Sequence, residues 1–221
     1  MDRRAFLNSG LAAGAVVAGI GSEGLAAEDK KVKILGISCS PRKGMTTATG
    51  VKVALEAARS VSNNISIELI DLGGITFSGW TGSPSAAQDD FDRQVLPKLK
   101  DPSVGGLIIG SPVYFRNASS VCMAFLERLA ALRKPRLLLA DKAVGILSVG
   151  AYRNGGQEMV IQQIQAAMLC HEVVVVGGKP GAHQGATLWN AYKDDIMKDE
   201  FGIDSAKKLG IRVAETALKL S

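Results

Sequence analysis

Residues 32–47 read VKILGISCSPRKGMTT, a short apolar run followed by a polar turn that contains glycine and proline. The run from Val32 to Ser38 has the length and composition of a buried strand. Beyond the turn, from Thr46 to Ser60, apolar residues recur at helical spacing. A buried strand that leads through a tight polar turn into a helix is the repeating unit of a βαβ fold.

The same alternation continues along the chain. The run Val104 to Ile109 is uninterrupted and apolar, as in a parallel strand that is buried on both faces. Further strands are predicted at Ile65–Leu72, Ala143–Val149 and Val173–Val176, and further helices at Asp89–Lys100, Ser119–Leu132, Gly156–Cys170 and Asp204–Leu220. We expect Asp204 or Ser205 to cap the last helix. Five strands alternating with helices predict the α/β class with a doubly wound parallel sheet.

The composition is that of a globular domain, with 47% hydrophobic and 21% charged residues. The formal net charge is +5, but its lysines and arginines are dispersed and form no stripe interleaved with aromatics. This pattern argues against nucleic acid as a partner. Because no second zone of composition appears, residues 28–221 are predicted to form one domain.

The first 27 residues are predicted to be a signal peptide. Residues 2–8, DRRAFLN, resemble the twin-arginine export consensus, and an uncharged stretch follows from Ala5 to Ser22. Small residues then offer cleavage before Ala27 or Glu28. The alternatives are a general secretory signal and an uncleaved anchor. The twin-arginine pathway carries folded proteins, so the sequence predicts a periplasmic protein that folds, with any cofactor, before export.

The turn after the first strand carries residues suited to phosphate. In parallel sheets, ligands bind beyond the carboxyl ends of the strands, and a helix N-terminus presents unpaired amides there. The predicted cradle consists of hydroxyls and one guanidinium, from Ser38, Ser40, Arg42, Thr46 and Thr47. The alternative is an ordinary turn with a capping threonine.

Three further loops follow strands at the same edge. In the first, Gly110 to Asn117, Pro112 is expected to stiffen a turn, while Tyr114 and Phe115 offer flat faces to a planar ring. The alternative is that both aromatics plug the end of the sheet. The second runs from Gly150 to Glu158 and the third from Gly177 to Ala186, and both are rich in glycine.

Three segments in this order, SCSPRKGMTT, GLIIGSPVYF and YRNGGQE, resemble the NADPH-dependent FMN reductase and iron–sulfur flavoprotein branch of the flavodoxin-like superfamily. The resemblance implies a flavodoxin-like sheet of order 2-1-3-4-5, non-covalent FMN and a homodimer or homotetramer. At matched positions it implies phosphate contacts from Ser38, Ser40, Arg42, Met45, Thr46 and Thr47, and ring contacts from Pro112, Val113, Tyr114, Phe115, Arg153, Asn154, Gly155, Gly156 and Gln157.

The sequence departs from that pattern in two places. It has Met45-Thr46-Thr47 where relatives show Gly-Asn-Thr or Gly-Ser-Thr. Its segment from Ile75 to Gln88 contains none of the cysteines that the iron–sulfur relatives place there. A cluster needs thiolate ligands, so no iron–sulfur centre is expected.

The predicted function is an FMN-dependent oxidoreductase that passes electrons through the flavin to a small acceptor such as a quinone, a flavin or a metal ion. The flavin carries the redox chemistry, so no catalytic side chain is assigned. The resemblance implies NAD(P)H as donor, whereas export away from cytoplasmic nicotinamides favours a membrane quinol or a redox-protein partner. The alternatives are a non-enzymatic periplasmic FMN electron carrier and a flavin-free protein that keeps only the fold.

The three cysteines suggest no metal site or disulfide framework. Cys39, inside the phosphate turn, is either a thiol activated by the helix N-terminus or a small residue that fits. Cys122 and Cys170 fall on predicted helices and are expected in the core.

Overall fold

The computed structural model describes residues 30–82, 89–191 and 193–221, so the predicted signal peptide lies outside the described residues. The elements in chain order are β1 (Val32–Ser38), α1 (Thr46–Arg59), β2 (Ile65–Asp71), η1 (Phe91–Val95), α2 (Leu96–Leu99), β3 (Val104–Tyr114), β4 (Asn117–Ala118), α3 (Ser120–Arg128), η2 (Leu129–Leu132), β5 (Ala143–Gly150), α4 (Gln157–Leu169), β6 (Val174–Val175), β7 (Ala186–Trp189), η3 (Ile196–Lys198) and α5 (Glu200–Leu220).

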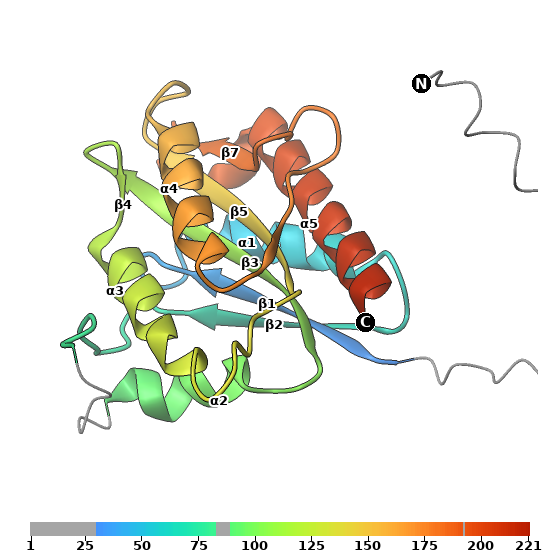
Figure 1. Ribbon diagram of the computed structural model, residues 1–221. Helices are drawn as coiled ribbons and strands as arrows, with labels where there is room; N and C mark the ends of the chain where they lie inside the picture. The colour runs from blue at the N-terminus through green and yellow to red at the C-terminus, as the bar shows by residue number, and fades with distance from the viewer. Residues whose placement is uncertain (1–29, 83–88, 192) are drawn as a thin grey trace, which may run out of the picture.

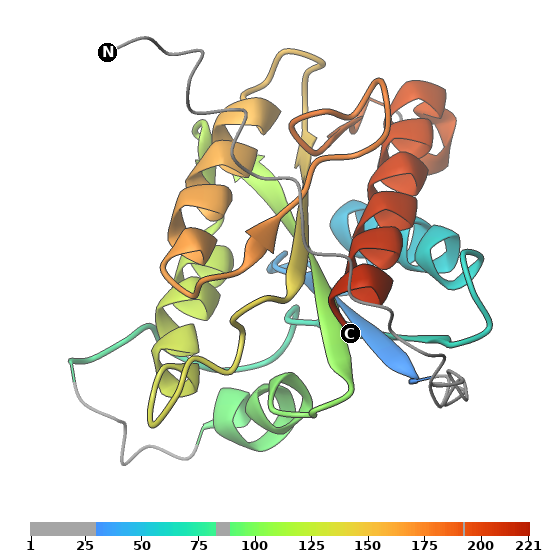
Figure 2. The same ribbon diagram turned by 45° about the vertical axis from the view of Figure 1, so that its right-hand side comes forward.

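Five strands form a parallel sheet in the order β2-β1-β3-β5-β6, to which β4 adds an antiparallel pairing with β3 and β7 a parallel pairing with β5. Since β5 and β6 are the fourth and fifth predicted strands, this is the flavodoxin-like order 2-1-3-4-5. Helices α1 and α5 cover one face of the sheet, and α3 and α4 cover the other (Figures 1 and 2). The predicted doubly wound α/β fold is confirmed. None of the helices in the described part of the chain is long and apolar enough to cross a membrane.

Each face of the sheet has its own apolar core. Within β3, Leu107 and Ile109 join the core under α3 and α4, while Ile108 joins the core under α1 and α5. Burial on both faces explains why this strand is a continuous apolar run. Close packing of α1 on α5 depends on Gly210, where a Cβ would lie 1.9 Å from the carbonyl oxygen of Ala54.

Strand β3 is longer than predicted and ends at Tyr114. The expectation that Pro112 stiffens a turn is therefore wrong, since Pro112 lies in the strand opposite Val149 of β5. Strand β1 pairs with β3 only as far as Gly110. Beyond that point β3 has β5 alone as its parallel neighbour, so a proline, which lacks an N–H donor, is tolerated.

The last third of the chain differs most from the prediction. The predicted strand Val173–Val176 shrinks to the two residues of β6, and the unpredicted strand β7 takes over the edge by pairing with β5. Helix α5 begins at Glu200 with Asp199 as N-cap, so neither Asp204 nor Ser205 is the cap. The first turn contains Gly202, a weak helix former that favours a later start. Burial of Ile203 in the core outweighs that preference.

Two predicted helices are interrupted. Residues 89–100 form a π-helical turn, η1, followed by the short helix α2, in which a proline occupies the first turn. The predicted helix Ser119–Leu132 divides into α3 and the 3₁₀ turn η2. Ser119 caps α3 by accepting a hydrogen bond from the Cys122 amide at 3.1 Å.

An ionic network joins η1 to α3. The Arg128 guanidinium, with a side chain only 6% exposed, pairs with Asp89 at 2.5 Å and Asp92 at 2.8 Å. It also lies 4.8 Å from the centroid of the Phe91 ring and donates to the Ser78 carbonyl at 3.2 Å. Arg128 lowers the pKa of Asp89 by hydrogen bonding, against the effect of burial. The network fastens residues 78 and 89–92 to α3.

We predict that Arg128→Met lowers the free energy of unfolding by about 3 kcal/mol, because it leaves partly buried carboxylates unpaired. Urea denaturation followed by circular dichroism measures this change. The control is Arg59→Met, whose ion pair with Glu56 is exposed and is worth less than about 1 kcal/mol. Equal losses in the two variants would contradict the prediction.

Candidate functional site

The turn between β1 and α1 leaves a helix N-terminus open. The N-cap is Met45, in extended conformation, and its side chain makes no capping hydrogen bond. Thr46 and Thr47 are already the first residues of the helix and are buried. The alternative of a capping threonine is therefore wrong. The first amides of α1 need acceptors that the N-cap does not supply.

A second unmet polar group lies beside this helix start. The Ser38 hydroxyl, at the carboxyl end of β1, is fully buried and has no hydrogen-bond partner. The Ser40 hydroxyl accepts from the Arg42 amide at 3.1 Å and so shapes the turn. A buried hydroxyl without a partner is costly unless a ligand satisfies it. Open amides and an orphaned hydroxyl at one turn fit the phosphate of a nucleotide.

Two carboxylates that the sequence did not single out organise this turn. Asp71, at the end of β2, accepts from the Gly44 amide at 2.7 Å and from the Gly73 amide at 3.2 Å. Asp194 takes both arms of the Arg42 guanidinium, at 3.0 and 2.9 Å. Asp71 follows a strand at the ligand edge and could have been expected there, whereas Asp194 lies in a loop that carried no signal.

The Arg42–Asp194 pair fixes the charge at the mouth of the turn. Hydrogen bonding to Arg42, and then to Asn190, holds the pKa of Asp194 below its usual value, so this carboxylate is ionised at neutral pH. Asp194 raises the pKa of Arg42, and Tyr114 adds to this effect by a weaker interaction.

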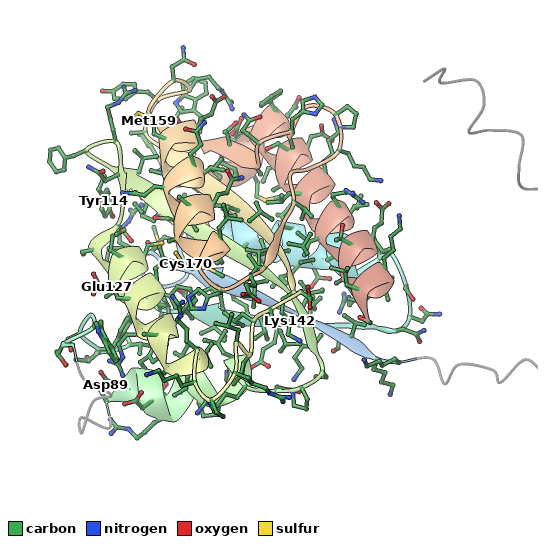
Figure 3. The ribbon with its side chains drawn as sticks, viewed as in Figure 1. Asp89, Tyr114, Glu127, Lys142, Met159 and Cys170 are labelled. Carbon is green, nitrogen blue, oxygen red and sulfur yellow. The ribbon has the colours of Figure 1, made fainter. Side chains whose placement is uncertain are left out.

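The predicted ring-binding loops meet at the same edge. Tyr114 is 41% exposed, and Phe115 is 99% exposed in the short hairpin between β3 and β4. The alternative that these aromatics plug the end of the sheet is therefore wrong. Figure 3 shows Tyr114 and Met159 at this end of the molecule. Phe115 and Arg116 both have positive φ, and the Cα of Arg116 would lie 3.4 Å from a Cβ added at Gly156.

The β5–α4 loop is braced from within. Gln157 is buried, donates to the carbonyls of Tyr152 at 2.7 Å and Leu188 at 3.2 Å, and accepts from the Gly155 amide at 2.9 Å. Gly156 is the left-handed N-cap of α4, with φ 105°. Gln157 and Gly155 therefore hold the shape of the loop through these contacts with the protein.

Arg153 makes contacts with the protein as well as lining the open end of the β5–α4 loop. It pairs with the buried carboxylate of Asp199, and its guanidinium lies 5.1 Å from the Trp189 ring centroid and 5.4 Å from that of Phe201. Its Nη1 atom is buried and has no partner. Asp199 also accepts from the Trp189 amide at 2.6 Å, so one carboxylate joins three elements.

A cavity of about 410 Å³ opens beside these loops. Four predicted residues line it, namely Arg153, Asn154, Gly156 and Gln157, together with Arg116, Met159, Thr187 and Phe201 among others. The Arg116 guanidinium has the Met159 sulfur as its acceptor, at 3.1 Å, which is a weak partner for a charged donor. The residues of the phosphate turn do not line this cavity. The cavity is therefore distinct from the phosphate turn.

The cysteines divide by burial. Cys39 and Cys122 lie in the core, and burial, followed by interaction with Cys122, raises the pKa of Cys39 well above its usual value. Cys39 is therefore not an activated thiol. Cys170 is exposed at the end of α4, so the prediction that it lies in the core is wrong (Figure 3).

The fold and the arrangement of loops define a flavodoxin-like protein. Residues 32–187 match the model of the NADPH-dependent FMN reductase family, and the chain belongs to that family. Membership supports FMN as the cofactor and a flavin-dependent oxidoreductase as the general class.

Relatives and solved structures agree with this assignment. The chain is 36% identical to an iron–sulfur flavoprotein of Methanocaldococcus jannaschii, covering 83% of this chain and 96% of that protein. It is 32% identical to the iron–sulfur flavoprotein of Methanosarcina thermophila, covering 80% and 93%. Its fold is similar to that of an NADH:FMN oxidoreductase, with a TM-score of 0.59, 21% identity and coverage of 86% and 91% of the two chains.

The residues present do not fit an iron–sulfur cluster. The chain has three cysteines in all, fewer than the four thiolates that bind common clusters. They lie on separate elements, and the described residues contain no group of three or more potential metal ligands. The iron–sulfur part of the relatives' names is therefore not carried over.

We predict that a maleimide reagent labels Cys170 rapidly in the folded protein, while Cys39 and Cys122 react only after denaturation, because the reactive thiolate must be accessible. Peptide mass spectrometry after timed labelling locates each modified residue. Rapid labelling of Cys39 in the folded protein would show that the phosphate turn opens.

Proposed function

We propose that this chain is an FMN-dependent oxidoreductase that takes electrons from a donor onto bound flavin and passes them to a small acceptor. The observation that carries the proposal is the open N-terminus of α1 beside the orphaned Ser38 hydroxyl. An uncapped helix start with a buried unsatisfied donor is suited to a phosphate group. Family membership supplies the identity of the nucleotide.

The residues of the turn would hold the phosphate in three ways. The amides at Thr46 and Thr47 provide neutral donors, Ser38 and Ser40 provide hydroxyls, and Arg42 provides charge. The hairpin that carries Pro112, Val113, Tyr114 and Phe115 would flank the isoalloxazine ring on one side, and the loop from Arg153 to Gln157 on the other. Bound FMN supplies the redox chemistry. The protein orients it and limits solvent access.

The cavity beside Arg116 and Arg153 is suited to the second substrate. It adjoins both ring loops and combines two guanidinium groups with the apolar surfaces of Met159 and Phe201. A flat substrate with an anionic group would find both kinds of contact there. NAD(P)H and several quinones or flavins belong to this class.

We further propose that the protein acts in the periplasm after twin-arginine export and that its donor is a membrane quinol or a redox protein. Residues 2–8 support export, and a periplasmic enzyme has no supply of reduced nicotinamide. We also propose a homodimer or homotetramer. Exposed apolar side chains at the flavin end, including Phe115, Met123, Tyr152 and Met159, support association.

The experiment is a donor screen on purified, FMN-loaded protein with NADH, NADPH and a soluble quinol, each under anaerobic conditions. Bleaching of the flavin band by the quinol and reoxidation by a quinone of higher potential would support the proposal. Rapid reduction by NADPH alone would contradict the change of donor. Reduction without turnover of any small acceptor would identify an electron carrier, and failure to take up FMN would contradict the flavin assignment itself.

We predict opposite effects for the two members of the Arg42 pair. Arg42→Ala weakens FMN binding at least about tenfold, because it removes a charge-assisted contact to phosphate. Asp194→Asn strengthens binding about threefold, because it frees Arg42 and removes an exposed negative charge. Quenching of flavin fluorescence on binding measures both dissociation constants.

The control for that pair is Arg59→Ala, which removes an equal charge at the far end of α1 and should leave FMN affinity unchanged. Weaker binding by Asp194→Asn would show instead that Asp194 positions Arg42 for the phosphate.

A further inference from the structure

The amino ends of the strands, opposite the flavin end, carry two adjacent cavities. One, of about 120 Å³, is lined by Lys30, Lys31 and Lys142 together with backbone and the end of α5. The other, of about 270 Å³, is lined by Lys100, Arg136 and Lys142. The two cavities share Lys142, the residue immediately before β5. Figure 3 shows Lys142 at this end of the sheet, away from Tyr114 and Met159.

The positive charges here are only partly offset by acidic side chains. In the described residues none of the five cations that line the cavities forms an ion pair, whereas neighbouring Lys33 pairs with Asp101 at 2.5 Å. Two acidic side chains line the cavities, Asp141 in the first and Asp101 in the second. Asp101 is already engaged by Lys33 and by the Ser103 hydroxyl at 2.6 Å. The site therefore has an excess of positive charge.

Lys142, which lines both cavities, is affected by burial and by its charged neighbours. It is half-buried, and burial, followed by repulsion from Lys30, lowers the pKa of its ammonium group, while Asp141 acts weakly in the opposite direction. Charged groups withdrawn from water are normally paired. An anion seated between Lys30 and Lys142 would supply that missing partner.

We propose that these cavities form a binding site for a phosphate group, either free phosphate or the headgroup of an anionic phospholipid. Lysine ammonium groups bind phosphate as point charges, and several of them around a small cavity match a compact anion with several acceptor oxygens. Arg136 provides the fork that can take two of those oxygens. The site lies at the amino end of β1, and it leaves the flavin end directed away from whatever is bound.

The test measures binding of two probes to the full protein at low ionic strength. Isothermal titration calorimetry with inorganic phosphate tests the free anion, and co-sedimentation with vesicles of phosphatidylglycerol and phosphatidylcholine tests the headgroup, with pure phosphatidylcholine as blank. We predict that Lys142→Met and Arg136→Met each weaken binding at least about fivefold, and that added salt weakens it in the wild type. Lys52→Met is the matched control, because Lys52 is exposed on α1 and lines neither cavity.

The outcomes distinguish free phosphate from a lipid headgroup and identify the results that would contradict the proposal. Binding of phosphate alone assigns the site to a soluble anion, and binding of anionic vesicles assigns it to a headgroup. Binding of neither probe, or equal weakening by Lys52→Met, overturns the proposal. FMN affinity is measured in every variant and should not change. The result of this test is therefore independent of the proposed flavin function. A second measurement is the rate of Lys142 acetylation as a function of pH. Bound phosphate should raise the pH midpoint of that curve.

Discussion

Backbone amides at the start of a helix need acceptors, and α1 begins after Met45, whose side chain provides none. The turn before it is held by several contacts: Cys39 is buried, Ser38 pairs within the sheet and Asp71 accepts from the Gly44 amide. The first amides of α1 therefore remain available to donate hydrogen bonds to a ligand. Each other feature of the flavin end is arranged around that opening.

The acidic residues at the opening have two different effects. Asp71 accepts hydrogen bonds from the Gly44 and Gly73 amides and so sets the shape of the turn. Asp194 binds the guanidinium that a phosphate would also need. Because that pair is partly exposed, its net contribution is small, and a phosphate dianion supported by helix amides can displace it. The pair occupies Arg42 when no phosphate is bound, and it must break before Arg42 can bind phosphate.

Much of the fold followed from the sequence, because both faces of the sheet are buried and the strands are continuous apolar runs. The order of the sheet followed from family resemblance rather than from the pattern. Strand β7 was missed, since its four residues follow a glycine-rich stretch and acquire strand geometry only by pairing with β5. The position of Pro112 within β3 was missed for the same reason, because it depends on pairing with β5 beyond the point where β1 ends. The residues proposed for phosphate lie together because they adjoin one strand, whereas Asp194 and Asp199 come from segments distant in sequence. Only the tertiary fold brings these two to the site.

The relatives named iron–sulfur flavoproteins are similar over most of their length, yet the chain has too few cysteines for such a cluster. In this chain, ion pairs and hydrogen bonds hold residues 78–80 and 89–92 against α3. Arg128 fastens residues 78 and 89–92, and Glu127 accepts from the Trp80 amide at 2.9 Å. An ionic clamp of this kind stabilises this region without a metal, but it cannot relay electrons. On the proposed function, electrons must therefore pass directly between the flavin and an external partner, which requires that the ring loops remain accessible at the protein surface. The exposure of Tyr114 and Phe115 beside the open cavity meets that requirement.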